Sequence, residues 1–209
     1  VLVTHADSDH TGGLAPLSSH YRIAGAIHGG SMEGNSASQA WERELKAAAV
    51  TPVLVSRGDR IRIGECLMTV LHPEAPLAHN DAQDNDRSLV ILLEYGQFRM
   101  LLTGDAGRAV EDDLRNAGTS LRAAVLKVSH HGAATATSAE FMAAVHPQLA
   151  VISVGAENWY GHPAPEVLQR LAEADVTVLR TDEVGTIAIA TDGERFWVEA
   201  ARPAEPLTE

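Results

Sequence analysis

Short apolar runs alternate with longer amphipathic segments along this chain, and the alternation restricts the folds that it can adopt. Strands are predicted at the short apolar runs, residues 1–3, 51–55, 60–63, 66–71, 88–95, 98–103, 124–128, 149–154, 177–180, 186–190 and 195–199. Helices are predicted where apolar residues recur at helical spacing, at residues 38–49, 109–117, 138–145 and 165–174. Strands and helices in this mixed order predict a layered α/β architecture.

The residues between these elements support the assignment. Gly96 and Gln97 form the turn of a predicted hairpin. Ser138 is a predicted helix N-cap, and Pro165 suits the first turn of the last helix. Residues 74–87 are polar and contain proline, so they are predicted to be a loop.

Length and composition narrow the possible functions. A chain of 209 residues predicts one domain, over residues 1–200, with a frayed tail at 201–209. No apolar run approaches the length of a membrane span. One cysteine excludes an internal disulfide framework and a cysteine-built zinc site. With 16 basic and 28 acidic residues the net charge is −12, which disfavours generic binding of polyanions.

The densest group of potential metal ligands follows the first strand. Four side chains with nitrogen or oxygen donors fall within six residues, namely His5, Asp7, Asp9 and His10. On a turning segment, Asp9 and His10 can face one metal ion while His5 and Asp7 face another. The alternative is a polar loop with solvated histidines and a capping aspartate. Four ligands in six residues behind an apolar strand favour the metal site.

Two further apolar strands end in potential ligands. Asp105 lies just beyond the run at residues 98–103, after a glycine that permits close approach of the backbone. His130 and His131 follow the next buried run. Alone, the Gly-Asp pair favours an ordinary turn, and the His-His pair suits a ligand role and an idle surface role equally. Together with the first group, they predict a binuclear hydrolytic site at one edge of a sheet.

A fourth loop is predicted on the same edge, at residues 158–163, which read Asn-Trp-Tyr-Gly-His-Pro. Its histidine, His162, can transfer a proton or bind a substrate phosphate. A capping role for His162 ahead of Pro163 is an equally good interpretation.

The chain contains no internal repeat that would favour another architecture.

In this order the motifs resemble those of the metallo-β-lactamase superfamily. The segment from His5 to Gly13 is similar to the family motif His-x-His-x-Asp-His, with Asp7 in place of the second histidine. That aspartate variant resembles the soluble hydrolase domain at the C-terminal end of the ComEC family of DNA-uptake channel proteins. Other segments similar to the family are residues 71–73, 85–90, 102–105, 129–132, 158–163 and 181–185.

The resemblance implies a four-layer αββα sandwich with two metal ions at one edge. It implies a set of metal ligands made up of His5, Asp7, Asp9, His10, Asp105 and His130. Asp105 would bridge the two ions. His130 is preferred as a ligand because it lies nearer to the strand end, and His131 is the alternative. Asn85 lies in the loop where the family has another ligand histidine, so it is a possible site residue.

The resemblance also implies a reaction. A hydroxide shared by the two metal ions would attack phosphorus, and Asp9 would accept the proton of that water. His162 would be the second catalytic residue, and Asn158 and Tyr160 would contact the substrate. Two carboxylates in place of imidazoles favour Mn²⁺, with Zn²⁺ and Mg²⁺ as alternatives.

The start of the chain departs from the family. Family domains have strands before the metal motif, whereas here the motif begins at His5, without an initiator methionine or a signal peptide. The expectation is a domain cut from a longer protein and lacking its N-terminal strands. It would be the extracytoplasmic part of a protein with a membrane channel, or a cytoplasmic enzyme if free-standing.

Three functions are therefore open. The first is a phosphodiesterase or nuclease that acts on single-stranded DNA during competence-linked uptake. The second is a hydrolase of small esters, thioesters or lactams on the same fold, because the fold does not determine the substrate. The third is a degenerate metal-binding module without turnover, which the missing histidine and the missing strands favour.

Overall fold

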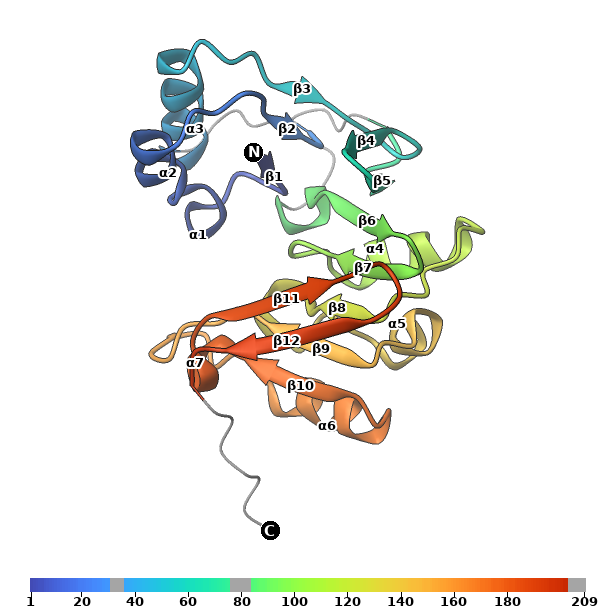
Figure 1. Cartoon of the computed structure of the whole chain (residues 1–209). Coiled ribbons are helices and arrows are strands. Elements are labelled where there is room, and N and C mark those ends of the chain that lie inside the picture. Colours follow the sequence, from blue (N-terminus) through green and yellow to red (C-terminus); the bar gives the residue numbers. More distant parts are fainter. Residues whose placement is uncertain (31–35, 76–83, 203–209) are drawn as a thin grey trace.

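A seven-stranded mixed sheet forms the centre of the molecule (Figure 1). The computed structural model describes residues 1–30, 36–75 and 84–202. In spatial order the strands of this sheet are β10 (Thr177–Arg180), β9 (Leu149–Ile152), β8 (Val125–Lys127), β7 (Phe98–Leu102), β6 (Val90–Tyr95), β5 (Cys66–His72) and β4 (Arg60–Ile63). The strands β7, β8, β9 and β10 are parallel to one another. The strands β4, β5, β6 and β7 pair antiparallel in succession. The sheet therefore combines parallel and hairpin halves.

Two smaller β units cover one face of this sheet. The first is a parallel sheet of β1 (Leu2–Val3), β2 (Ile27–His28) and β3 (Val53–Leu54). The second is a hairpin of β11 (Ile187–Thr191) and β12 (Phe196–Ala200). Val70, Leu89 and Ile91 pack between the large sheet and the β1–β3 unit, while Phe98 meets Phe196 of the hairpin at a ring distance of 5.8 Å.

Helices form the two outer layers. The central sheet is covered by α4 (Arg108–Asn116), α5 (Ala139–Val145) and α6 (Pro165–Glu173). The β1–β3 unit carries α1 (Ser8–Thr11), α2 (Leu14–His20) and α3 (Ser36–Ala47). Trp41 of α3 is buried with Val3 and Leu14 in the core beneath these helices. The result is the predicted αββα sandwich, with the smaller β layer split into a sheet and a hairpin.

Local sequence explains where these helices begin. The Ser138 side chain accepts a hydrogen bond from the Phe141 N–H at 3.2 Å, so the predicted N-cap of α5 is confirmed. Pro165 occupies the first turn of α6, where its missing N–H costs no helical hydrogen bond. Each helix turns apolar side chains, such as Phe141 and Leu171, onto the sheet.

Most predicted elements are found within one to three residues of their predicted ends, and the differences are in short elements. The predicted ranges do not include the helices α1, α2 and α7 (Thr181–Val184), the strand β2 and two 3-10 turns at Asp84–Arg87 and Ser129–Gly132. They are too short to show a periodic pattern. The predicted strand at residues 51–55 is reduced to β3. The predicted loop 74–87 and tail 201–209 lie partly outside the described residues.

The parallel half of the sheet determines where loops meet. Because β7, β8, β9 and β10 run in the same direction, the turns that follow them leave from one edge. The turn after β1 reaches the same edge, since Leu89 N–H donates a hydrogen bond to the Thr4 carbonyl at 2.9 Å. None of the helices in the described ranges has the length and apolarity needed to cross a membrane.

Candidate metal centre

Asp105 lies at the middle of this edge, three residues beyond the end of β7. Its side chain is buried, and its backbone N–H donates to Ser88 Oγ at 2.8 Å. Gly104 before it has φ +54°, and a Cβ there would meet the Ser88 side chain at 2.9 Å and the Thr4 side chain at 3.0 Å. Glycine is therefore required both for the backbone conformation and for the close approach of the two loops.

Four side chains that could bind a metal ion, Asp105 among them, converge on one point. One donor atom from each of Asp9, His10, Asp105 and His131 lies within 4.8 Å of the others. His10 Nε2 and His131 Nε2 are 3.3 Å apart. The Nε2 atoms of His10 and His131 lie 3.3 and 3.4 Å from the two carboxylate oxygens of Asp105. Ligands bound tetrahedrally at about 2.1 Å from a zinc ion lie about 3.4 Å apart, so this donor set fits a cation.

His5 and Asp7 extend this group of side chains. His5 Nε2 is 3.5 Å from Asp7 Oδ2 and 3.9 Å from Asp105 Oδ2. The His5 and His10 rings have centroids 4.2 Å apart. Asp105 thus lies close both to His5 and to the histidines of the four-residue cluster.

Two buried atoms at the centre lack hydrogen-bond partners among the described residues, namely His5 Nε2 and Asp105 Oδ1. A buried polar atom without a partner is costly, and a bound cation would remove that cost. The opposite nitrogen of His5 contacts Thr4 Oγ1 at 3.0 Å and Ser88 Oγ at 3.3 Å. The imidazole is thereby held by one nitrogen while Nε2 faces the acidic side chains, the usual arrangement around a metal ligand.

The backbone after β8 decides which of the two neighbouring histidines joins the cluster. His130 and His131 both have positive φ values, 47° and 54°. His131 Nδ1 donates to the Ser153 carbonyl at 2.7 Å, which fixes its tautomer and leaves Nε2 for Asp9, 3.1 Å away. His130 Nε2 is 4.0 Å from Asp105 Oδ2 and lies outside the four-residue cluster. The geometry thus favours His131, although proximity to the strand end favoured His130.

Asn85 occupies a different place from the ligands. Its side-chain nitrogen lies 3.3 Å from the His130 ring, and His130 in turn meets His162 edge to face at a centroid distance of 5.7 Å. These three side chains form a second row beside the cluster, where they can orient a substrate or a loop.

The charges around Asp105 keep it ionised. Burial alone would raise the pKa of Asp105, but the neighbouring His10 and His131 imidazoles and the charge of Lys127 outweigh burial and hold that pKa well below its usual range. Lys127 Nζ lies 3.7 Å from Asp105 Oδ1 and donates to the Gly104 carbonyl at 3.0 Å. An ionised, buried carboxylate is the form that binds a divalent cation.

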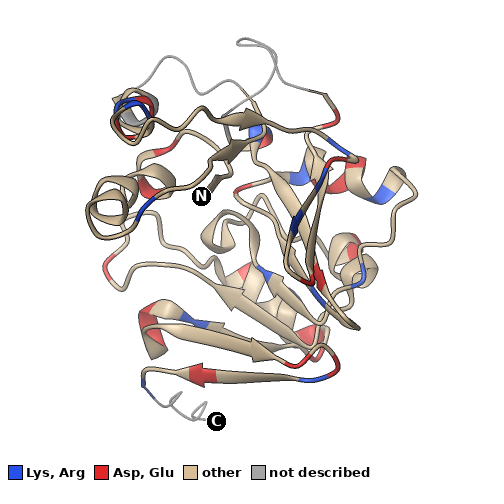
Figure 2. Ribbon diagram, turned by 45° about the horizontal axis from the view of Figure 1, so that its top comes forward, with Lys and Arg blue, Asp and Glu red and all other residues tan. Residues whose placement is uncertain are grey.

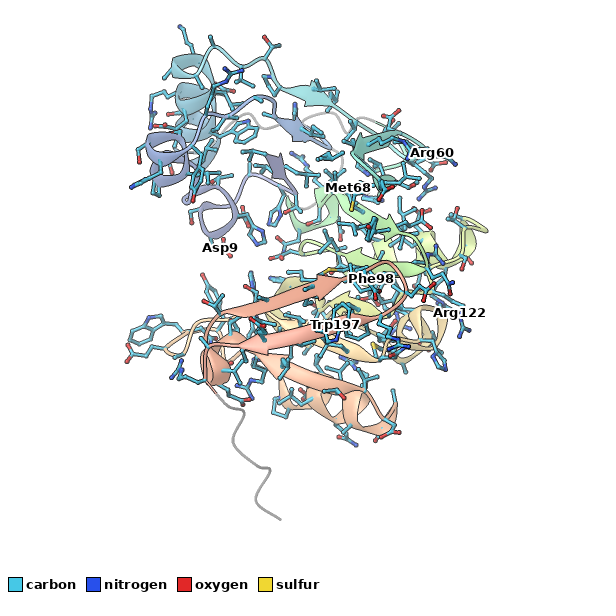
Figure 3. The ribbon with its side chains drawn as sticks, in the orientation of Figure 1. Asp9, Arg60, Met68, Phe98, Arg122 and Trp197 are labelled. Carbon is cyan, nitrogen blue, oxygen red and sulfur yellow. The ribbon has the colours of Figure 1, made fainter. Side chains whose placement is uncertain are left out.

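A pocket of about 450 Å³ opens beside the cluster, and its lining includes Asp9, His131, Asn158, Tyr160 and His162. Figure 3 labels Asp9 on α1, and 60% of its side-chain surface is exposed. Burial lowers the pKa of His162, and the neighbouring His130 and His131 lower it further, so the ring is neutral near pH 7 and can accept a proton.

Asn158 braces the loop that carries His162. Its Nδ2 donates to the Gly155 carbonyl at 3.0 Å and to the His162 carbonyl at 2.8 Å, and its Oδ1 accepts the His162 N–H at 2.9 Å. Its hydrogen-bonding groups are thus used within the loop, although the sequence predicted contact with substrate. Tyr160, the other predicted substrate contact, lies 83% exposed on the pocket rim.

Sequence reasoning missed three groups that support the centre. Ser88 contacts both His5 and Asp105, Lys127 lies beside Asp105, and the Ser153 carbonyl orients His131. A lysine inside the otherwise apolar run at residues 124–128 was a usable signal, because an isolated buried cation needs a partner. Nothing in the local sequence distinguishes Ser88 or Ser153.

The chain is similar in sequence to three bacterial proteins. It is 37% identical over 190 residues to ComE operon protein 3 of Bacillus subtilis, covering 90% of this chain and 24% of that protein. It is 35% identical over 113 residues to competence protein ComA of Neisseria gonorrhoeae, covering 54% and 16%. With recombination protein 2 of Haemophilus influenzae it shares 27% identity, covering 97% and 23%. The chain thus spans about a quarter or less of each of these relatives.

Solved structures show the same fold. CmlA, a diiron β-hydroxylase from Streptomyces venezuelae, has a TM-score of 0.57 at 16% identity, covering 86% of this chain and 42% of that one. The metallo-β-lactamase fold protein YhfI from Bacillus subtilis has a TM-score of 0.53 at 11% identity, covering 95% and 76%. A sequence model of the metallo-β-lactamase superfamily matches residues 1–156, which agrees with the sandwich and with the motif that begins at His5. This chain therefore belongs to the metallo-β-lactamase superfamily.

Proposed function

We propose that this chain is a metal-dependent phosphodiesterase or nuclease that acts on DNA during competence-linked uptake. The observation that supports it best is the cluster of Asp9, His10, Asp105 and His131 at one end of an open pocket. The competence relatives supply the link to DNA uptake. The metal ligands and catalytic roles below belong to the same proposal.

The donor atoms would hold two divalent ions that share Asp105. Asp9, His10 and His131 would bind one ion, and His5 and Asp7 the other. His130, which the motif also allows as a ligand, lies nearer to Asn85 and His162 than to the cluster centre. The mixed nitrogen and oxygen donors suit Mn²⁺ or Zn²⁺, with Mg²⁺ as a further candidate. Bound ions of this kind activate water and offset charge that develops on phosphoryl oxygens.

Two side chains of the pocket, Asp9 and His162, would then accept and return protons. Asp9 is the most exposed carboxylate of the cluster, so it can accept the proton of an attacking water. His162 faces the same pocket and is neutral near pH 7, and it can take up and return a proton on the leaving-group side. Partly buried Lys127 and buried Ser88 hold Asp105 in place beside the ligand groups.

The net charge of −12 supports a second candidate, a hydrolase of small esters, thioesters or lactams. Figure 2 shows Lys and Arg dispersed along the ribbon among acidic residues. A nuclease usually gains affinity from a basic surface, whereas a small neutral substrate needs none. A pocket of about 450 Å³ accommodates either a small molecule or one nucleotide.

We also propose that the chain is the extracytoplasmic hydrolase part of a longer protein with a membrane channel. Its relatives are about four or more times longer than the matched segment, which supports this context. Labelling of an introduced surface cysteine in intact cells by a membrane-impermeant reagent tests the location. A cytoplasmic, free-standing enzyme would remain unlabelled.

Hydrolysis assays separate these functions. The purified chain is incubated with single-stranded DNA and with a chromogenic phosphodiester in Mn²⁺, Zn²⁺ or Mg²⁺. We expect metal-dependent cleavage that is lost in Asp105→Asn and retained in Asp112→Asn, a matched change at a partly exposed aspartate of α4 outside the cluster. Cleavage of the chromogenic compound without cleavage of DNA would favour the small-substrate hydrolase. Metal binding without turnover on either substrate would reject both and favour a non-catalytic module.

A further inference from the structure

Two neighbouring aromatic side chains project from the rim of the pocket. Trp159 is 99% exposed, and Tyr160 next to it is among the pocket-lining residues. The chain has only three tryptophans and three tyrosines. Full exposure of the largest apolar side chain leaves its ring in water without a packing partner, and tryptophans are highly buried on average. A fully exposed Trp-Tyr pair at the mouth of a site therefore indicates a ligand.

The loop presents these rings from a fixed base. Asn158 precedes Trp159, and two hydrogen bonds of its side chain join it to the backbone of His162, two residues beyond Tyr160. A third hydrogen bond joins it to the Gly155 carbonyl. Tyr160 and His162 are stacked, with centroids 5.9 Å apart and an angle of 16° between the rings. A held aromatic surface costs less conformational entropy on binding than a mobile one.

Tyr160 links this loop to the metal cluster. His162 joins Tyr160 on one side to His130 on the other, at 5.9 and 5.7 Å between ring centroids. The same pocket is lined by Asp9 and His131 of the cluster. A planar group stacked on Tyr160 would thus be held next to the cluster, and Trp159 is the adjacent residue of the same loop.

The charges of the pocket favour planar groups over phosphates as the main source of affinity. No Lys or Arg is among the described residues that line it. The nearby Arg180 is neutralised by ion pairs with Asp182 at 2.5 Å and Glu183 at 2.8 Å. Base stacking on aromatic side chains contributes affinity that does not depend on basic residues.

We infer that Trp159 and Tyr160 form a stacking platform for unpaired nucleobases of a single-stranded nucleic acid, beside the metal centre. This inference rests on the proposed function, since it specifies how an acidic phosphodiesterase holds its polymeric substrate. It assigns Trp159 as a substrate-binding residue. It also explains how a chain with a net charge of −12 binds DNA without a basic surface.

The test compares two labelled oligonucleotides of equal length by fluorescence anisotropy. One is an oligothymidylate and the other carries abasic sites throughout, both with phosphorothioate linkages that slow hydrolysis. We expect Trp159→Ala to raise the Kd for the oligothymidylate about 10-fold and to leave the Kd for the abasic chain unchanged. Trp159→Phe should restore part of the affinity, because its ring still stacks.

Trp197→Ala is the matched control. Trp197 is half exposed on β12, and Figure 3 shows it apart from Asp9. This variant should bind both oligonucleotides as the unsubstituted chain does. An unchanged thermal midpoint shows that Trp159→Ala is folded. The inference is overturned if Trp159→Ala binds oligothymidylate normally, if it loses affinity for the abasic chain equally, or if the unsubstituted chain binds neither oligonucleotide.

Cleavage of an unmodified abasic chain in Mn²⁺ separates this inference from the proposed function. Trp197→Ala should cleave that chain as fast as the unsubstituted protein, since Trp197 belongs to neither the cluster nor the pocket lining. Base-dependent binding without any cleavage would reject the phosphodiesterase and keep the platform. Cleavage with base-independent binding would keep the phosphodiesterase and reject the platform.

Discussion

Removing the His131 imidazole should weaken metal binding far more than removing its neighbour. His131 Nε2 lies 3.1 Å from Asp9, 3.4 Å from Asp105 and 3.3 Å from His10 Nε2. Loss of a residue that merely orients a ligand costs 10- to 100-fold in affinity, so His131→Ala, which removes a donor, should cost about 100-fold. That ratio corresponds to about 2.8 kcal/mol of binding free energy.

The weaker Mn²⁺ binding of His131→Ala should also reduce the rise of Tm that the metal produces. At a Mn²⁺ concentration of about 100 times the original Kd, the unsubstituted protein gains about 2.7 kcal/mol of stability. The variant would then be near its own Kd and gain about 0.4 kcal/mol. For a chain of this size the difference is about 5 to 9 °C in the metal-induced rise of Tm. Calorimetric unfolding with and without Mn²⁺ measures it.

His130→Ala is the matched control, because His130 Nε2 is 4.0 Å from Asp105 Oδ2 and lies outside the four-residue cluster. We expect less than about a tenfold change in its Kd for Mn²⁺, below the range for a residue that orients a ligand, because the His130 ring lies against Asn85 and His162. The assignment from geometry is refuted if His130→Ala weakens Mn²⁺ binding as much as His131→Ala does. Isothermal titration of both variants gives the two affinities directly.

Three further changes test other parts of the structure. Gly104→Ala should destabilise the chain by about 3 kcal/mol in urea unfolding, because the added Cβ meets Ser88 at 2.9 Å and the backbone has φ +54°. Glu111→Ala should cost about 3 kcal/mol by the same measurement, because the buried Glu111 carboxylate accepts backbone N–H groups, among them that of Thr137. Asn158→Ala should lower kcat about tenfold in the hydrolysis assay and leave the Kd for Mn²⁺ unchanged, since it frees the catalytic loop without touching the cluster.

Two of these changes have a matched control in the same chain. Gly118 also has a positive φ, +74°, but a Cβ there meets nothing within 4 Å, so Gly118→Ala isolates backbone strain from the clash. Glu140 is exposed on α5, and Glu140→Ala should change stability by less than about 0.5 kcal/mol. Equal losses in a variant and its control would contradict the reasoning for that pair. For Asn158→Ala, a weaker Kd for Mn²⁺ would show that the loop and the cluster are coupled.

The layered fold and the region of the site were predictable because they depend on local patterns. Apolar periodicity gives the strands and helices, and parallel strands bring the residues after them to one edge. Asp105 and the pair His130 and His131 were expected there for that reason. The motif from His5 to His10 supplied the rest of the centre.

Other details depend on contacts between distant segments, which a single sequence does not reveal. The choice of His131 over His130 follows from two successive residues with positive φ and from the Ser153 carbonyl. Ser88 reaches His5 from 83 positions away in the chain. The bracing role of Asn158 likewise appears only when the loop is folded, because its partners are the backbone groups of that loop.

The centre joins the two halves of the sandwich. Asp9 and His10 belong to the β1–β3 side, whereas Asp105 and His131 follow strands of the seven-stranded sheet. A cation held by all four side chains would act as a cross-link that closes the long loop of chain between the motif and β7. The affinity for metal would then report on how tightly the two layers are held together, so a core substitution between the sheets that loosens them would weaken metal binding without altering any ligand.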